Sequence, residues 1–404
     1  MKVSSLEDVA TLNAGLWDVI VIGAGPGGAT AAYRLAEAGH RTLLVDRQMF
    51  PRSKVCGGCI SHRSLRRLRS LGLGGVVDSL SGPSFSSLRI QTDRGRDLTI
   101  PLPEGKAITR SVLDQALVRA AVDRGVCFVP DVTARLVAPA ADADLSATNV
   151  ASRAVSLRAR AGKVYRIRGR VVIVADGLGH PSLSGLEEFR SVQSRRSRIG
   201  LGAVLESGPA GHESGVVRMA VGRGGYVGMV RAEGGRCVIA AAVDPEFLRE
   251  QPTRSDAVAS ILRDSGCPIP EAVFEAPWSG TPALSQNLTH PVGRRVLVIG
   301  DSAGYVEPFT GEGIAWALDD AASVPRFVGR GVVEWTAEIE ADWLGARKMR
   351  VVRDQRLSRL TSRILRSPLG FDALIRVLTL CPSLADAGIA RMNPAGWTET
   401  ETSA

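Results

Sequence analysis

The first sixty residues show a hydrophobic pattern that predicts a strand, a helix and a second strand. Residues 18–22 form a short β-branched apolar run, which is typical of a buried parallel strand. A helical period with a row of alanines then continues to about Ala38, and Gly39 supplies a C-terminal stop. The next apolar run ends in Asp46. This order predicts an α/β fold with a parallel sheet.

Later segments extend this predicted sheet. A helical period covers residues 109–125, and Arg110 lies at its start, where it could reach a phosphate. Two further apolar runs, at 171–174 and 296–299, are each followed by a pair made of glycine and aspartate. These pairs are Asp176-Gly177 and Gly300-Asp301. Ligands of open α/β sheets bind at the carboxyl ends of the strands, so both pairs are candidate site residues.

The remaining patterns divide the chain into three parts. We expect a Rossmann-type domain from residues 1–80 with 109–185 and 291–330. Residues 186–290 hold short strand-like runs between glycine turns, and residues 81–108 read as a hairpin, so together they predict an inserted, mostly antiparallel β domain that supplies one wall of a substrate pocket. Residues 331–404 are predicted to be helical.

The glycines between the first strand and helix carry the strongest chemical signal. Gly23, Gly25 and Gly28 form G-x-G-x-x-G, with Pro26 and Gly27 between them. This spacing allows a tight turn, a close approach of backbone to a pyrophosphate, and close packing of helix on strand. Asp46, 18 residues past Gly28, can accept hydrogen bonds from a ribose diol, which favours FAD or NAD over NADP. A glycine-rich turn in another kind of α/β protein is the alternative.

A second helix start favours flavin over nicotinamide. Gly311, Glu312 and Gly313 follow a proline-containing loop, and a helix is predicted from about Ile314. The partial positive charge of a helix N-terminus would stabilise a reduced, anionic isoalloxazine ring, and nicotinamide has no comparable need.

Composition and charge exclude several classes of protein. The 404 residues include six cysteines and no apolar run of about 18 residues, so we expect neither a disulfide framework, a secretory signal nor a membrane span, and a cytoplasmic location is the default. The formal charge of +9 comes from scattered arginines without stacking aromatics, which argues against nucleic-acid binding. The basic segment 347–367 could lie on a membrane surface or could be the cationic outer face of a packing helix. The oligomeric state stays open.

The stretch CGGC leaves three interpretations open. Cys56 and Cys59 could be half of a zinc site, but the other cysteines are isolated and only His62 is near, so we expect no metal. They could be a redox disulfide, but adjacent glycines are unlike the usual helix-starting pair. The third interpretation is that Gly57 and Gly58 let the backbone pass close to a flavin, with Cys56 beside the ring.

With these motifs in this order, the chain resembles the FAD-dependent aromatic-hydroxylase-like flavoproteins, which share a glutathione-reductase-like FAD fold and include monooxygenases, halogenases and geranylgeranyl reductases. The resemblance covers about residues 17–330. It implies that Arg110 meets the FAD pyrophosphate, that Val132 offers backbone contacts to adenine and that Asp301 bonds the ribityl-phosphate part. It further implies a set of neighbours of the cofactor: Arg47, Asp176, Gly177, Gly300, Pro308, Gly311, Gly313 and Ile314.

Two stretches are similar to the geranylgeranyl reductase branch: Cys-Gly-Gly at 56–58 and the glycine-Glu-Gly-Ile pattern at 311–314. We therefore expect an enzyme that reduces a carbon–carbon double bond of a hydrophobic, isoprenoid- or polyketide-like molecule with FADH₂, with NAD(P)H as transient electron donor. Cys56 and Glu312 are candidate catalytic residues. An NAD(P)H-dependent monooxygenase acting on an aromatic or polyketide substrate is the alternative, and a disulfide reductase using Cys56 and Cys59 is a third.

Overall fold

The computed structural model describes residues 16–138, 151–209, 211–307, 309 and 311–392. Its first sheet places β1 (Trp17–Ile22) between β2 (Thr42–Val45) and β9 (Val164–Val174), parallel to both. β18 (Val296–Val298) continues the sheet in parallel on the far side of β9. The other members are β6 (Cys127–Val129), β7 (Val132–Leu136), β8 (Arg153–Ala159) and β17 (Val292–Gly293). The predicted parallel α/β sheet is confirmed.

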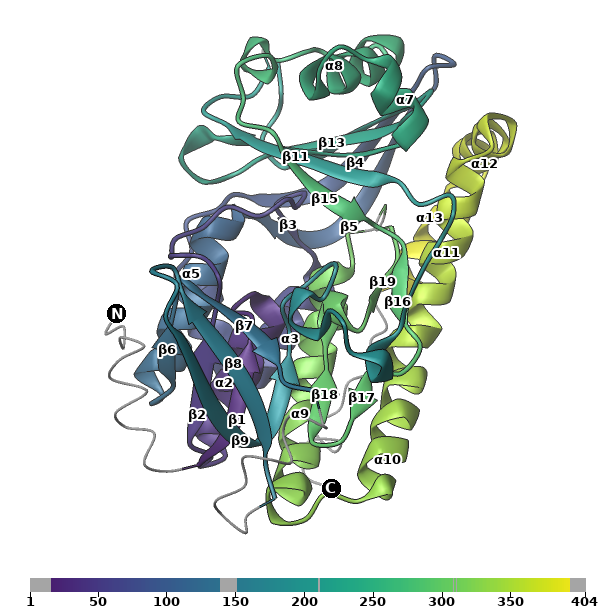
Figure 1. The fold of residues 1–404 in the computed structure, drawn as a ribbon. Helices are drawn as coiled ribbons and strands as arrows, with labels where there is room; N and C mark the ends of the chain where they lie inside the picture. The colour runs from purple at the N-terminus through teal and green to yellow at the C-terminus, as the bar shows by residue number, and fades with distance from the viewer. Residues whose placement is uncertain (1–15, 139–150, 210, 308, 310, 393–404) are drawn as a thin grey trace.

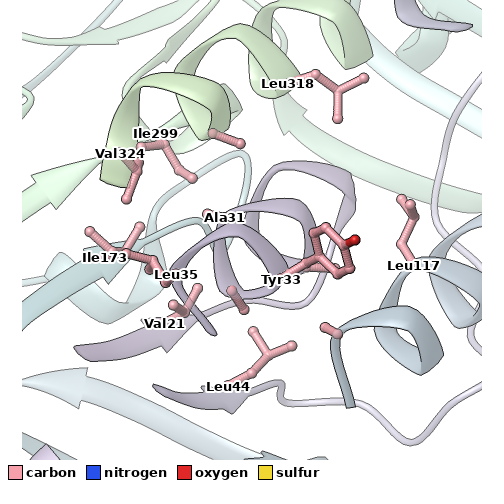
Figure 2. Close-up of a cluster of buried hydrophobic side chains, with 14 of the residues drawn as sticks. Val21, Ala31, Tyr33, Leu35, Leu44, Leu117, Ile173, Ile299, Leu318 and Val324 are labelled. Carbon is pink, nitrogen blue, oxygen red and sulfur yellow. The ribbon is translucent and has the colours of Figure 1, made fainter. Parts of the chain in front are cut away.

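Three helices cover one face of this sheet: α2 (Pro26–Glu37), α5 (Arg110–Asp123) and α9 (Gly313–Val333). The alanines of α2 keep its side chains short, so α2 packs closely on the strands and against α9. Figure 2 shows Leu35 of α2 near Val21 and Ile173 of the sheet, while Tyr33 points towards α5. This core fixes the start of α2 and the start of α9 at the same edge of the sheet.

A second eight-stranded sheet lies above the first (Figure 1). Its neighbours pair antiparallel, apart from the parallel pair of β4 (Ser84–Thr92) and β12 (Val216–Gly222). In order, its other strands are β15 (Ser279–Ala283), β11 (Ile199–Leu205), β14 (Cys237–Val243), β13 (Gly225–Arg231), β5 (Asp97–Ala107) and β3 (Cys59–Ile60). The predicted hairpin at 81–108 is present as β4 and β5. Two helices, α7 (Pro245–Glu250) and α8 (Arg254–Asp264), pack on its outer face.

Smaller elements join the two sheets. A three-stranded sheet contains β10 (Ser191–Gln193), β16 (Gln286–Leu288) and β19 (Gly304–Tyr305). Two short helices, α3 (His62–Leu68) and α4 (Gly74–Asp78), follow the cysteine stretch. Because β3 pairs with β5, the chain around Cys59 crosses from the first sheet to the second.

The C-terminal part is helical, as expected, and runs along one side of the molecule (Figure 1). α10 (Ala337–Arg347) passes through a π-helical turn, Lys348–Val352, into α11 (Arg353–Leu365). α12 (Pro368–Leu380) and α13 (Pro382–Met392) then turn against each other by 105°. No single helix among the described residues is long and apolar enough to cross a membrane, although α12 and α13 together pass that test by length and composition.

Candidate active site

A cavity of about 880 Å³ lies between the carboxyl edge of the first sheet and the inner face of the second. One end is lined by the glycine turn before α2 and by the start of α9. The other end is lined by apolar side chains of β4, β5, β12 and β13 and by α12 and α13. The cavity therefore joins a dinucleotide motif to an apolar chamber, which is the arrangement expected where a cofactor meets a hydrophobic substrate.

The glycine turn is shaped by contacts that exclude side chains. Gly23 has φ +101, and a Cβ there would lie 2.3 Å from the carbonyl oxygen of Ala175. A Cβ on Gly28 would lie 1.8 Å from the carbonyl oxygen of Gly23, so this glycine serves helix packing. A Cβ on Gly25 would face the guanidinium groups of Arg110 and Arg52, at 3.5 and 3.7 Å. Gly23, Gly25, Pro26 and Gly27 line the cavity, and this cradle fits a pyrophosphate.

Asp46 is held at the end of β2 by two backbone N–H groups. Its Oδ2 accepts from Ala24 N at 2.8 Å, and its Oδ1 accepts from Gln48 N at 2.9 Å. The carboxylate lines the cavity beside Arg47, where it can still accept from a ribose hydroxyl. Val132 also lines the cavity, but its N–H already donates to the carbonyl oxygen of Asp46 at 3.0 Å, so that group is not free for adenine.

Three cationic side chains gather beside the turn. Arg110 binds Asp114 through two hydrogen bonds of 2.8 Å, and Nη1 of Arg52 lies 3.1 Å from the same carboxylate. Lys54 lines the cavity as well, and removal from water, followed by the charge of Arg110, lowers its pKa. An anionic ligand would relieve this repulsion. Sequence reasoning found Arg110 but missed Arg52 and Lys54, although two cations shortly after a second strand were a usable signal.

The two predicted aspartate–glycine pairs differ in their roles. Asp176 lines the cavity, but its carboxylate accepts from Ser182 N at 2.8 Å and from Ser302 Oγ at 3.0 Å, so it braces the turn after β9. Burial raises the pKa of Asp176. Asp301 faces the cationic cluster; burial raises the pKa of its carboxyl, and Lys54 and then Arg110 oppose that rise. Gly177 and Gly300 line the same cavity edge.

Glu312 is a buried carboxyl in the cavity wall. It is the N-cap residue of α9, it lines the cavity and it is only 6% exposed. Its Oε2 is buried without a hydrogen-bond partner and lies 3.7 Å from Nη1 of Arg63. Burial raises the pKa of Glu312 to about 7, against the opposing charge of Arg63. The side chain can therefore hold a proton near neutral pH and release it to a neighbouring atom.

The cysteine stretch contributes backbone and one wall. Cys56, Gly57 and Cys59 line the cavity, and a Cβ on Gly57 would meet no atom within 4 Å. Gly58 does not line it. Its φ of +70 and the side chain of Val238, 2.8 Å from a Cβ, explain that glycine by folding alone, and its contact with the cofactor stays a prediction. Both cysteines are free thiols, and burial raises the pKa of Cys59.

The rest of the predicted set is also at this end of the cavity. Gly311, Gly313 and Ile314 line it at the start of α9, whereas Pro308 falls outside the described residues. No group of three or more His, Cys, Asp or Glu side chains in the described part of the chain is placed to hold a metal ion. The gathered elements (glycine turn, ribose acceptor, cationic cluster and helix start) fit FAD.

Fold and site together define an FAD-dependent oxidoreductase. Residues 17–327 match the FAD binding domain family, and because this match covers most of the chain, the chain belongs to that family. The resemblance stated from the sequence is thereby confirmed, as are the fold class and the expectation of an enzyme.

Relatives with assigned names include several reductases. The chain is 26% identical over 325 residues to digeranylgeranylglycerophospholipid reductase of Methanocaldococcus jannaschii, covering 75% of this chain and 74% of that protein. It is 25% identical over 338 residues to conditioned medium factor receptor 1 of Dictyostelium discoideum, covering 75% and 61%. It is 34% identical over 170 residues to menaquinone reductase of Mycobacterium tuberculosis, covering 41% and 38%. The match thus spans less than two thirds of the last two proteins.

Solved structures share the fold at low identity. The p-nitrophenol 4-monooxygenase PnpA of Pseudomonas putida superposes with a TM-score of 0.74 at 12% identity, covering 94% of this chain and 98% of that one. At this identity the likeness concerns the fold alone, because one fold supports many reactions.

Proposed function

We propose that this protein reduces a carbon–carbon double bond of an apolar small molecule of the isoprenoid class. The observation that carries the proposal is a buried carboxyl, Glu312, with a pKa raised to about 7, in the cavity wall at the start of α9. Adding a hydride to an alkene leaves a carbon that needs a proton, and this side chain can donate one.

The apolar end sets the class of substrate. Its walls come from the second sheet and from the C-terminal helices. They include Phe85, Leu88, Ile100, Met219, Leu284 and Phe371. These side chains offer area to a hydrocarbon and few partners to a polar ring substituent. The archaeal relative is named for reducing a geranylgeranyl lipid, which supports an isoprenoid rather than a polyketide substrate.

In this proposal the chain binds and orients the cofactor and the substrate and excludes water, while bound FAD in its reduced form would supply a hydride, which carries both electrons. The glycine turn, Arg110, Arg52 and Lys54 would hold the phosphates, and Asp46 would hold the ribose. The start of α9 places a partial positive charge beside the ring site. Glu312 gives its proton to the second alkene carbon and regains one from solvent afterwards. We further propose NAD(P)H as the source of electrons.

Dithiol chemistry at Cys56 and Cys59 has less support. A thiol whose pKa is raised by burial is protonated at neutral pH, and the protonated thiol is a poor nucleophile. We therefore give these cysteines no redox step.

The test is anaerobic mixing of the reduced holoenzyme with an isoprenoid alkene, followed by flavin absorbance. We expect the alkene to reoxidise the flavin, and a matched saturated isoprenoid to leave it reduced. Reoxidation by neither compound, or by both equally, would contradict alkene reduction. Reduction of the oxidised holoenzyme by NADH or NADPH under the same conditions tests the proposed electron donor.

A further inference from the structure

Helix α12 is apolar on opposite sides. Phe371, Ile375 and Leu378 face inwards and line the cavity. On the other side, Leu369 and Leu380 are 71% and 80% exposed. The exposed side is not wholly apolar, since it also carries Arg376, 60% exposed and paired with Asp372. The described residues bury only one side of α12.

The exposed apolar surface continues onto the next helix. Val377 of α12 is 46% exposed, and Leu384 of α13 is 51% exposed while it also lines the cavity. We call the four side chains of Leu369, Val377, Leu380 and Leu384 the outer apolar face. These side chains come from two consecutive helices, and a group of exposed apolar residues is typical of a docking site, in contrast to single scattered residues. The same two helices, α12 and α13, also line the substrate cavity.

The helix that leads into this face carries uncompensated positive charge. α11 contains four arginines and one aspartate in its 13 residues. Burial lowers the pKa of Arg359, and the neighbouring charges of Arg356 and Arg363 lower it further, so these three cations repel one another. The inner side of α11 is occupied by packing, since Gln355, Ser358 and Ser362 are buried. Its arginines therefore supply attraction for an anionic surface, and the apolar anchor lies beyond them in α12 and α13.

We propose that the outer apolar face docks this protein on the surface of an anionic lipid bilayer, and that an apolar substrate passes from the bilayer between α12 and α13 into the cavity. Binding of this kind needs both buried apolar area and attraction to anionic lipid, and the structure provides each on adjoining helices. A second copy of the chain is less suitable as the occupant, because a twofold interface would bring the arginines of both copies together. The substrate route, but not the docking itself, rests on the proposed function.

The test is sedimentation of the FAD-loaded protein with vesicles of phosphatidylglycerol and phosphatidylcholine, without substrate. We expect binding to the mixed vesicles and weaker binding to phosphatidylcholine alone. The double substitution Leu369→Glu/Leu380→Glu should lower the partition coefficient about a hundredfold, because each buried leucine contributes roughly tenfold. The matched control is Val192→Glu/Val333→Glu, which adds the same charge at valines 59% and 86% exposed elsewhere, and it should bind like the wild type.

Two further readouts keep the inference open to refutation. Arg359→Gln/Arg363→Gln should weaken binding to the mixed vesicles roughly tenfold and leaves the outer apolar face unchanged. This variant tests the docking if the leucine variant loses FAD. Absence of wild-type binding would overturn the proposal, as would equal binding by the leucine variant. If the wild type is a dimer in sedimentation velocity and does not bind vesicles, and the leucine variant is a monomer, the outer apolar face would be assigned to self-association instead. Alkene reduction in detergent tests the proposed function separately, so the two can fail independently.

Discussion

Nη1 of Arg63 lies 3.7 Å from Oε2 of Glu312 but 2.7 Å from Oδ2 of Asp354. The same guanidinium donates to Asp319 at 2.6 Å through Nη2. One cation is therefore shared among three carboxylates, and Glu312 has the longest of the three contacts. This unequal sharing explains why burial prevails over the opposing charge and leaves a carboxyl that is protonated close to neutral pH.

Replacing this carboxyl tests its role as proton donor. Glu312→Gln keeps the size and the neutral charge of the side chain but cannot donate an acidic proton. We expect anaerobic reduction of an alkene to slow by roughly a hundredfold, the lower range for loss of a general acid. FAD affinity, measured by titration, should stay unchanged. An unaltered rate with FAD bound would remove Glu312 from the reaction.

The pH dependence follows from the direction of the shift. The pKa of Glu312 is raised from 4.5 in water to about 7 in the fold, so the folded state holds its proton more tightly. The contribution of the Glu312 proton to the free energy of unfolding is fully present below pH 4.5 and is lost as the pH rises through 7. We expect the reduction rate to fall above pH 7 in the wild type. We also expect Glu312→Gln to gain stability over the wild type at pH 8, by about 3 kcal/mol at most, in urea unfolding. Parallel pH profiles for both proteins would contradict this account.

The two glycines of the cysteine stretch should behave differently. Gly57→Leu projects a side chain into the cavity and should weaken FAD binding about tenfold or more, with little change in stability. Gly58→Ala forces a left-handed backbone and a contact of 2.8 Å with Val238, so it should cost about 2 kcal/mol of folding free energy. FAD titration and thermal unfolding of both variants separate these effects. A Gly58→Ala protein that is stable but flavin-free would reverse our assignment.

Lys54 should belong to the phosphate site although its pKa is lowered. Its amine lines the cavity near Arg110 and Asp301, and binding of an anionic pyrophosphate would oppose the lowering of its pKa. We expect Lys54→Met to reduce FAD affinity about tenfold, with a smaller loss at high salt, because a charge-assisted contact is removed. Lys106→Met is the matched control, since this amine donates to the carbonyl oxygen of Val77 at 3.1 Å within the protein. Equal FAD affinity in Lys54→Met and the wild type would exclude the contact.

Cys59 should be dispensable. Its Sγ donates to the carbonyl oxygen of Gly57 at 3.5 Å, and serine can make the same hydrogen bond. Cys59→Ser should therefore retain both FAD binding and alkene reduction within about twofold, since it leaves the cavity wall intact. Loss of turnover in Cys59→Ser, with FAD still bound, would revive a thiol mechanism.

The dinucleotide end of the site could be predicted because it depends on local sequence. The glycine turn, α2 and Asp46 lie within thirty residues, and their order and spacing are typical of a dinucleotide-binding turn and helix start. The start of α9 was found for the same reason. The pattern of short strands likewise predicted an antiparallel second sheet.

The apolar end of the cavity and the ion-pair partner of Glu312 could not be predicted, because both are made by packing between distant segments. Arg63 and Glu312 are 249 positions apart in the chain, and no periodicity links them. The apolar wall combines β4, β12 and α12, whose separate hydrophobic patterns fit an ordinary core equally well. For the basic segment 347–367 the sequence left two interpretations open, a helix on a membrane surface or the cationic outer face of a packing helix, and it did not single out the exposed leucines that follow in α12 and α13.

The most direct test of the central claim is the mass of the product. The holoenzyme, reduced by NADPH or dithionite, is incubated with an isoprenoid alkene with and without oxygen, and products are analysed by mass spectrometry. Alkene reduction predicts a product that has gained two hydrogen atoms without oxygen. A product that forms only with oxygen and contains one added oxygen atom would contradict the account and identify a monooxygenase.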